Sequence, residues 1–238
     1  MRGLRWYVAG AQLLISISAS AGPTGLNIIP TTDIVPFHSW IGQIQNSNTS
    51  FQVPAFYSAP DAILQSQFSL SPTIEAGVDY FTPPQADHSE PVFNIKALLL
   101  SEDEYRPNAA IGIWNVGLRQ PAGYYITLSK TLNYAQEQFE RFRAHHRRNR
   151  KLLGRRIHAG LAFDGHGAVA PFLGTDLQLN ENSVFQADWI SGSGNAISFG
   201  LAYVFPDQRT VLNPAILFSN NKQRVDGFIL SLSHQFNL

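Results

Sequence analysis

The sequence contains no cysteine among its 238 residues. The chain therefore has neither a disulfide framework nor a lipid-anchored N-terminus. Charged residues make up only 14% of the chain, and the formal net charge is zero. The basic residues are local rather than spread, so the sequence gives no general footprint for nucleic-acid binding. A secreted chain of this size without disulfides needs either a large core or a membrane to hold its structure.

The N-terminus has the pattern of a secretory signal peptide. Arg2 and Arg5 form a short basic start, and the apolar run at 6–18 is shorter than the roughly 20 residues of a spanning helix. Small residues at 19–21 form a cleavage signal before Gly22. We predict that 1–21 is removed and that 22–238 folds as one domain. The alternative is an N-terminal membrane anchor. No other apolar run is long enough for a transmembrane helix.

The last thirteen residues alternate between apolar and polar side chains. One parity carries Phe228, Leu230, Leu232, Phe236 and Leu238, and the other carries Gly227, Ser231, Ser233, Gln235 and Asn237. Side chains alternate faces along a strand, so this stretch predicts a ribbon with one apolar and one polar face. A closing strand with an aromatic residue near its C-terminus is common in bacterial outer-membrane barrels. His234, on the apolar parity, is tolerated near an interface.

Similar alternation recurs in fourteen segments of about 8 to 12 residues, which is the signature of a membrane barrel. We predict an all-β fold, an antiparallel transmembrane β-barrel of about 12–14 strands in a single domain. An even number returns both ends to the periplasm, and fourteen is favoured over twelve. Two segments, 22–35 and 51–58, are weak because each contains a proline. The alternative is a soluble β-sandwich or jelly roll.

The positions of the charged residues along the strands distinguish a membrane barrel from a soluble β-sandwich or jelly roll. An Arg or Lys on a lipid-facing side at mid-depth costs about 2–4 kcal/mol. The strand parity instead predicts that charged side chains face the lumen. The predicted lumen-facing polar residues are Glu75, Asp79, Lys96, Arg156, His158, Asp176 and Asp188.

One long insertion, at about 133–155, departs from the strand pattern. Its start favours helix, and it continues into a strongly basic stretch. The residues that would bind anions are Arg143, Arg147, Arg148, Arg150 and Lys151. Their partner would be lipid phosphate, an acidic polysaccharide or a periplasmic protein. The alternative is a solvated loop. Long loops usually face outward, yet counting strands back from a periplasmic C-terminus places this one in the periplasm.

No motif for catalysis, a cofactor or a metal stands out. His145 and His146 are adjacent, but the surrounding cations disfavour a metal there. His158, Asp164 and His166 lie close in sequence, and no serine is obviously paired with His158. The chain contains no phosphate loop, dinucleotide fingerprint or zinc spacing. We therefore predict that the protein is not an enzyme and carries no cofactor.

Three stretches resemble outer-membrane barrels of the YjbH-like family. Residues 25–32 (GLNIIPTT) resemble that family's opening strand. Residues 96–112 resemble one of its hairpins, with KALL at 96–99, then Glu102 or Glu104, and then Pro107, Ala110, Ile111 and Gly112. Residues 124–130 resemble the strand that follows. The resemblance implies a role in exopolysaccharide production and export across the outer membrane.

These observations lead to three hypotheses about function. The first is an outer-membrane barrel with a polar lumen that serves polysaccharide export or solute passage. Its partners would be outer-membrane lipid and a polysaccharide or a periplasmic export protein. The second is a structural or adaptor barrel with a plugged lumen that docks a partner through its basic insertion. The third is a membrane-embedded lipid-modifying enzyme.

Overall fold

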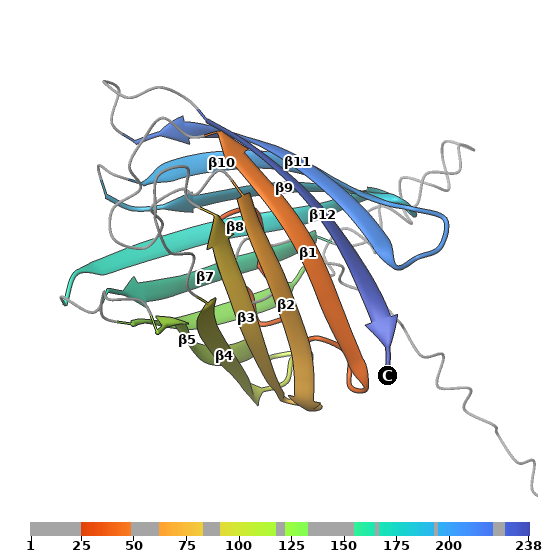
Figure 1. Cartoon of the computed structure of the whole chain (residues 1–238). Helices are drawn as coiled ribbons and strands as arrows, with labels where there is room; N and C mark the ends of the chain where they lie inside the picture. Colours follow the sequence, from red (N-terminus) through yellow and green to blue (C-terminus); the bar gives the residue numbers. More distant parts are fainter. Residues whose placement is uncertain are drawn as a thin grey trace, which may run out of the picture.

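The computed structural model describes residues 25–48, 62–82, 91–117, 122–132, 155–164, 167–192, 195–220 and 227–238. Within these residues, twelve antiparallel strands close into one barrel (Figure 1). The strands are β1 (Ser39–Asn48), β2 (Ala62–Ser71), β3 (Ile74–Thr82), β4 (Pro91–Leu100), β5 (Asn108–Val116), β6 (Gly123–Thr131), β7 (Arg155–Phe163), β8 (Val169–Asn180), β9 (Ser183–Ile190), β10 (Ala196–Val204), β11 (Thr210–Ser219) and β12 (Gly227–Asn237). This architecture confirms the predicted fold class.

The barrel closes by pairing its first and last strands. β1 and β12 run antiparallel in register from Ser39 opposite Asn237 to Asn48 opposite Phe228. Trp40 stacks on Phe236 across this seam, with ring centroids 4.1 Å apart. Every other strand pairs with its sequence neighbours. A closed sheet leaves no strand edge with unpaired backbone groups.

The favoured number of fourteen strands is wrong for the described part of the chain. The predicted first strand, 22–35, is replaced in its described residues by an irregular segment inside the barrel, with one isolated bridge between Gly25 and Pro30. Pro30 lacks a backbone N–H for a strand ladder, which disfavours a central strand here. The other weak segment, 51–58, lies outside the described residues. The remaining twelve predicted segments correspond to the twelve strands.

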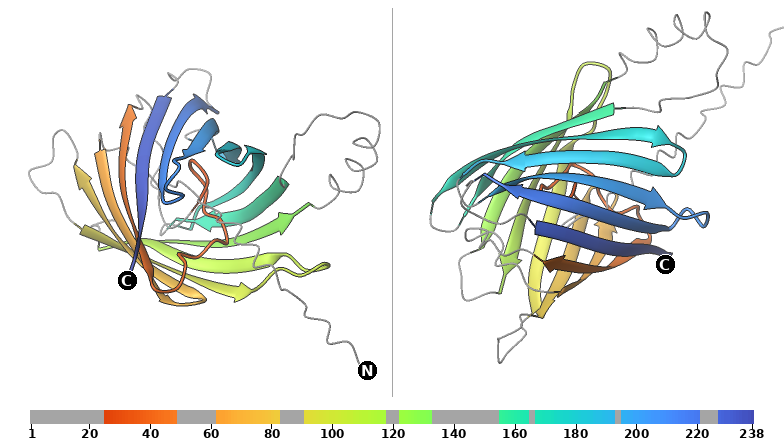
Figure 2. Two further views of the ribbon diagram at one scale, coloured as in Figure 1. Left: turned by 90° about the vertical axis from the view of Figure 1, so that its right-hand side faces the viewer. Right: turned by 90° about the horizontal axis from the view of Figure 1, so that it is seen from above.

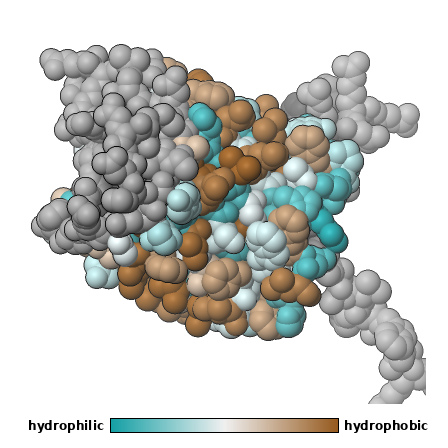
Figure 3. Space-filling model, in the orientation of Figure 1, coloured by the Kyte–Doolittle hydropathy of each residue, from teal (hydrophilic) through white to brown (hydrophobic). Residues whose placement is uncertain are grey.

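Apolar side chains cover the outside of the strands. On β10, Phe199, Leu201 and Tyr203 are 36–44% exposed, and the residues between them are buried. The same alternation continues on β12 with Phe228, Leu230 and Leu232 exposed. In Figure 3, apolar side chains spread over the face of the barrel in view, and polar ones gather toward its right-hand end. None of the described segments contains a helix long and apolar enough to cross a membrane.

β6 ends and β7 begins at the rim of the barrel that also holds the C-terminus. Neighbouring strands are antiparallel, so all even-numbered strands end at one rim. β6 ends there beside the start of β7, where the Leu132 amide donates to the Arg155 carbonyl at 2.8 Å. The Leu238 amide similarly donates to the His38 carbonyl at 2.7 Å. The predicted signal peptide, 1–21, and residues 133–154 of the insertion lie outside the described residues.

Candidate functional site in the barrel interior

Residues 25–36, which we call the inner segment, lie inside the ring of strands (Figure 2). The Leu26 amide donates to the Ile29 carbonyl at 2.9 Å, which forms a tight turn beside the Gly25–Pro30 bridge. Leu26, Ile29 and Val35 are at most 1% exposed. Such burial of a segment without regular secondary structure requires partners on the barrel wall for its backbone and side chains.

An apolar cluster holds the turn of the inner segment. Leu26 and Ile29 pack among inward-facing side chains from five strands. These wall residues are Trp114, Tyr125, Ala162, Ala170, Phe172 and Ile190. Gly174 on β8 leaves the space that the two side chains fill, because a Cβ there would lie 2.5 Å from Ile29 Cδ1 and 2.7 Å from Leu26 Cδ1.

Polar contacts hold the tip of the same turn. Asn27 Nδ2 donates to Ser198 Oγ at 3.0 Å, and Asn27 Oδ1 accepts from Asn213 Nδ2 at 3.1 Å. The Ile28 amide donates to Asp188 Oδ2 at 3.3 Å. Gly200 gives Asn27 its room, since a Cβ at that position would lie 2.2 Å from Asn27 Oδ1. The tip is therefore fitted to the inner faces of β9, β10 and β11.

A bidentate ion pair joins the middle of the inner segment to β7. Arg156 Nη2 and Nη1 donate to the two carboxylate oxygens of Asp33 at 2.8 and 3.0 Å. Asp176 also lies beside the same guanidinium, at 3.7 Å. Burial alone would raise the pKa of the Asp33 carboxyl, but Arg156 more than offsets this and holds the pKa well below its usual range. Asp33 is therefore a charged anchor of the inner segment.

A second ion pair lies where the inner segment passes β3 and β4. Lys96 Nζ lies 3.0 Å from Glu75 Oε1, and these side chains are 0% and 1% exposed. Lys96 Nζ also donates to the Thr31 carbonyl at 3.3 Å. The Val35 amide donates to Glu75 Oε2 at 2.8 Å. Each member of the pair thus holds one backbone group of the inner segment.

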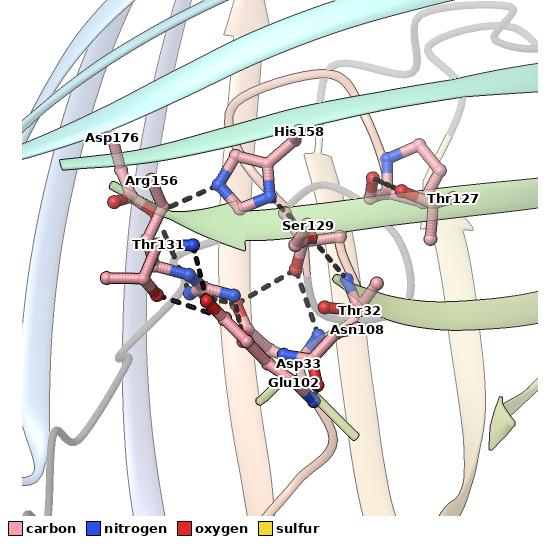
Figure 4. Close-up of polar contacts among 12 residues, drawn as sticks. Thr32, Asp33, Glu102, Asn108, Thr127, Ser129, Thr131, Arg156, His158 and Asp176 are labelled. Carbon is pink, nitrogen blue, oxygen red and sulfur yellow. Dashed lines mark hydrogen bonds and ion pairs between the residues drawn. The ribbon is translucent and has the colours of Figure 1, made fainter. Parts of the chain in front are cut away.

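A chain of polar contacts runs from Asp176 through His158 and Ser129 to the inner segment (Figure 4). His158 Nε2 lies 3.0 Å from Asp176 Oδ2, and Nδ1 lies 2.7 Å from Ser129 Oγ. With a neutral ring protonated on Nε2, Nδ1 accepts the Ser129 hydroxyl. Ser129 Oγ in turn accepts the Thr32 amide at 3.3 Å. The chain therefore ends at the backbone of the inner segment.

The contact between His158 and Ser129 corrects one interpretation of the sequence. No serine was expected to pair with His158, yet Ser129 lies directly opposite it across the β6–β7 ladder. These three residue types also form hydrolase triads. Here the serine oxygen is fully buried and engaged by Thr32, so its contacts are those of an anchor. Among the described residues, no group of three His, Cys, Asp or Glu side chains is placed to hold a metal ion.

The structure places all seven residues that were predicted to face the lumen on the inner side of the wall. Glu75, Asp79, Lys96, His158 and Asp188 are at most 3% exposed, and the side chains of Arg156 and Asp176 are 13% and 17% exposed. It groups them as the Glu75–Lys96 pair and the Arg156–His158–Asp176 cluster. Asp79 instead accepts from Asn94 Nδ2 at 2.7 Å, and Asp188 accepts from Ser198. The possible anion-binding residues Arg143, Arg147, Arg148, Arg150 and Lys151 lie outside the described residues, as do His145 and His146.

Sequence reasoning missed the residues of the inner segment that contact the wall. The available signal was that 22–35 lacks clean alternation and contains Pro30. Asp33 is the only charged residue between Gly25 and Pro36, which marks it as the segment's electrostatic anchor once the segment is placed inside. Ser129 gave no signal, because its partner depends on the register of β6 against β7.

Comparison with known proteins finds similarity only at the level of the structure. No family model matches the sequence. No curated protein matches it either. Among solved structures, a KdgM porin in complex with disordered oligogalacturonate has a TM-score of 0.49 and 8% identity, over 84% of this chain and 99% of the porin. The Acinetobacter baumannii outer-membrane protein Omp33 has a TM-score of 0.48 and 10% identity, over 84% and 98%.

A third similar structure is the NanC porin, with a TM-score of 0.47 and 8% identity over 84% of this chain and all of the porin. These scores lie below 0.5. The assignment of the barrel therefore rests on the strand pairing of this chain, which closes through β1 and β12.

Proposed function

We propose that this chain is a bacterial outer-membrane β-barrel whose polar interior passes small solutes and is held closed by the inner segment. One observation carries the proposal: the strands are apolar outside and carry buried charged and polar side chains inside, and a separate segment of the same chain lies within the ring of strands. An apolar exterior matches hydrocarbon, and a closed sheet satisfies every backbone group there. The irregular inner segment belongs to no strand of the closed sheet, and in this proposal it is the part that moves.

Export of a polysaccharide is a finer form of the same proposal, and it rests on the resemblance of residues 25–32 and their neighbours to YjbH-like barrels. The second candidate is a structural or adaptor barrel whose interior stays filled. The number of anchors on the inner segment favours it, since two ion pairs, an apolar cluster and the Asn27 contacts all oppose release. Movement of the inner segment separates the two candidates.

Crowding the inner segment out of the barrel tests the proposal. In the full-length double variant Gly174→Val with Gly200→Val, new side chains overlap Leu26, Ile29 and Asn27. Valine is favoured in strands, so the wall itself is retained. We expect the wild type to be mostly silent in planar lipid bilayers and the double variant to show stable conductance steps. The matched control is Gly77→Ala, at an inward glycine whose neighbours are Gln67, Ser66 and Asn94 rather than the inner segment.

A second full-length variant, Leu26→Ser with Ile29→Ser, loosens the segment without touching the wall. Deleting buried aliphatic groups weakens packing by about 2–5 kcal/mol for each large side chain. Heat-modifiable migration on a gel reports whether each variant has folded. Folded variants that stay silent in the bilayer would favour the adaptor barrel over the channel.

A further inference from the structure

The inner wall of the barrel is divided into a charged sector and a neutral sector. Strands β10, β11, β12, β1 and β2 are consecutive neighbours in the closed sheet. On their inner faces, the described residues include no charged side chain. The buried polar side chains of this neutral sector are Ser39, Ser198, Asn213, Ser231, Ser233, Gln43, Gln45, Gln65 and Gln67. Buried apolar side chains, among them Ala202, Val204, Val211 and Leu217, lie between the polar ones on β10 and β11.

Hydrogen bonds connect the amides of the neutral sector. Gln43 Nε2 donates to Gln65 Oε1 at 2.8 Å and to Gln45 Oε1 at 3.4 Å. Gln43 lies opposite Ser233 of β12 on one side and Gln65 of β2 on the other. Amides and hydroxyls both donate and accept hydrogen bonds, as the hydroxyl groups of a sugar do. The polar side chains of the neutral sector, which are densest on β12, β1 and β2, therefore offer the matching chemistry for hydroxyl-rich solutes without requiring a charge.

The charged sector, from β3 to β9 with the inner segment, has a surplus of acids. Its described inward carboxylates are Asp33, Glu75, Asp79, Asp176 and Asp188, and its permanent cations are Lys96 and Arg156. Asp33 leaves with the inner segment when that segment is displaced, so four wall carboxylates against two cations leave two formal negative charges, with His158 counted as neutral.

Both cations of the charged sector are already engaged. Lys96 is held by Glu75, and Arg156 lies beside Asp176, which stays on the wall when Asp33 leaves with the inner segment. Asp79 and Asp188, in contrast, accept hydrogen bonds from the neutral groups of Asn94, Ser198 and Ile28. An entering anion would meet the field of the surplus carboxylates and would have to displace a buried carboxylate to reach either cation.

We propose that the barrel interior selects neutral, hydroxyl-rich solutes such as monosaccharides and excludes anionic ones. The inference rests on the proposed function, because it applies to the barrel with its inner segment displaced. Two features determine the selection. The polar side chains of the neutral sector provide the hydrogen-bonding surface along which the solute passes, and the surplus carboxylates of the charged sector repel anions.

A pair of sugars that differ in one carboxylate tests the inference. Proteoliposomes that contain the full-length Gly174→Val/Gly200→Val variant are loaded with labelled galactose or labelled galacturonate, and efflux is measured. We expect galactose to leave about tenfold faster than galacturonate, since a charged lumen changes local ion concentration by at least that factor. The difference should shrink at high salt because mobile ions screen the carboxylates.

Neutralising Asp79 and Asp188, which accept hydrogen bonds from neutral groups, should reduce the discrimination between galactose and galacturonate. Adding Asp79→Asn and Asp188→Asn to the opened variant removes two surplus charges and keeps an acceptor oxygen at each position. The ratio of galactose to galacturonate efflux should then fall toward one. The matched control is Glu181→Gln in the exposed β8–β9 turn, which should leave the ratio unchanged.

The outcomes separate this inference from the proposed function. Efflux of galacturonate as fast as that of galactose from the opened variant would overturn the selectivity and leave the channel intact. An unchanged ratio in the Asp79→Asn/Asp188→Asn variant would overturn the assignment to these acids. Release of neither sugar from a folded opened variant would overturn the channel itself, and the selectivity with it.

Discussion

Replacing Lys96 with methionine should destabilise the folded barrel by about 3–5 kcal/mol, because it removes one partner of a fully buried ion pair. Glu75 would lose the ammonium group 3.0 Å from its carboxylate, in a site where the side chain is 1% exposed. The Thr31 carbonyl of the inner segment would also lose its contact with Lys96 Nζ. Unfolding by guanidinium in lipid vesicles, followed by tryptophan fluorescence, measures the change.

The double variant Lys96→Met with Glu75→Gln is the matched control for this prediction. Neutral residues of similar volume often replace a buried ion pair with little loss of stability. The side-chain oxygen of the introduced glutamine can still accept the hydrogen bond that the Val35 amide gives to Glu75. The double variant should therefore be more stable than Lys96→Met alone. A double variant as unstable as the single one would contradict the account of this pair.

An arginine on the outer face should have an effect that depends on its depth. Leu201 lies within β10 with its side chain 44% exposed, and Phe205 follows the end of the same strand at 37% exposure. In a hydrocarbon environment, Leu201→Arg should cost about 2–4 kcal/mol and Phe205→Arg about 0–1 kcal/mol. The free energy of unfolding in lipid vesicles gives both values.

Comparing the two sites distinguishes an effect of depth in the membrane from a loss of stability that arginine would cause at any outward position. Both residues are large, apolar and similarly exposed, so they differ mainly in their distance from the end of the strand. In a soluble barrel, water would surround both sites, and the two substitutions would have similar and small effects. Equal losses of stability would therefore count against a lipid-facing exterior.

The strands of the barrel wall could be predicted from the sequence because each strand is marked by a pattern within its own residues. Alternation in stretches such as 196–205 and 226–238 marks each strand and also tells which side chains face outward. The proline-containing stretch 22–35 lacks clear alternation, and only its place before the predicted strands in the sequence favours a weak strand there. Its actual environment depends on contacts with residues far away in the chain, such as that of Asn27 with Ser198.

The polar anchors were only partly predictable for the same reason. Strand parity identifies Arg156 and His158 as facing the same side as each other, but their partners depend on strand register and on the inner segment. Asp33 reaches Arg156 across 123 positions in the sequence, and Ser129 meets His158 through the pairing of β6 with β7. No spacing in the sequence encodes either contact.

The central claim is that hydrocarbon contacts the outward side chains of the strands. Because the chain has no cysteine, single cysteines at 198, 199, 201, 202 and 203 on β10 can each carry one nitroxide label without a competing site. In proteoliposomes, labels at 199, 201 and 203 should collide readily with oxygen and rarely with a water-soluble nickel complex, and the inward labels at 198 and 202 should be protected from oxygen. Frequent collision of the outward labels with the nickel complex would place them in water and contradict the account.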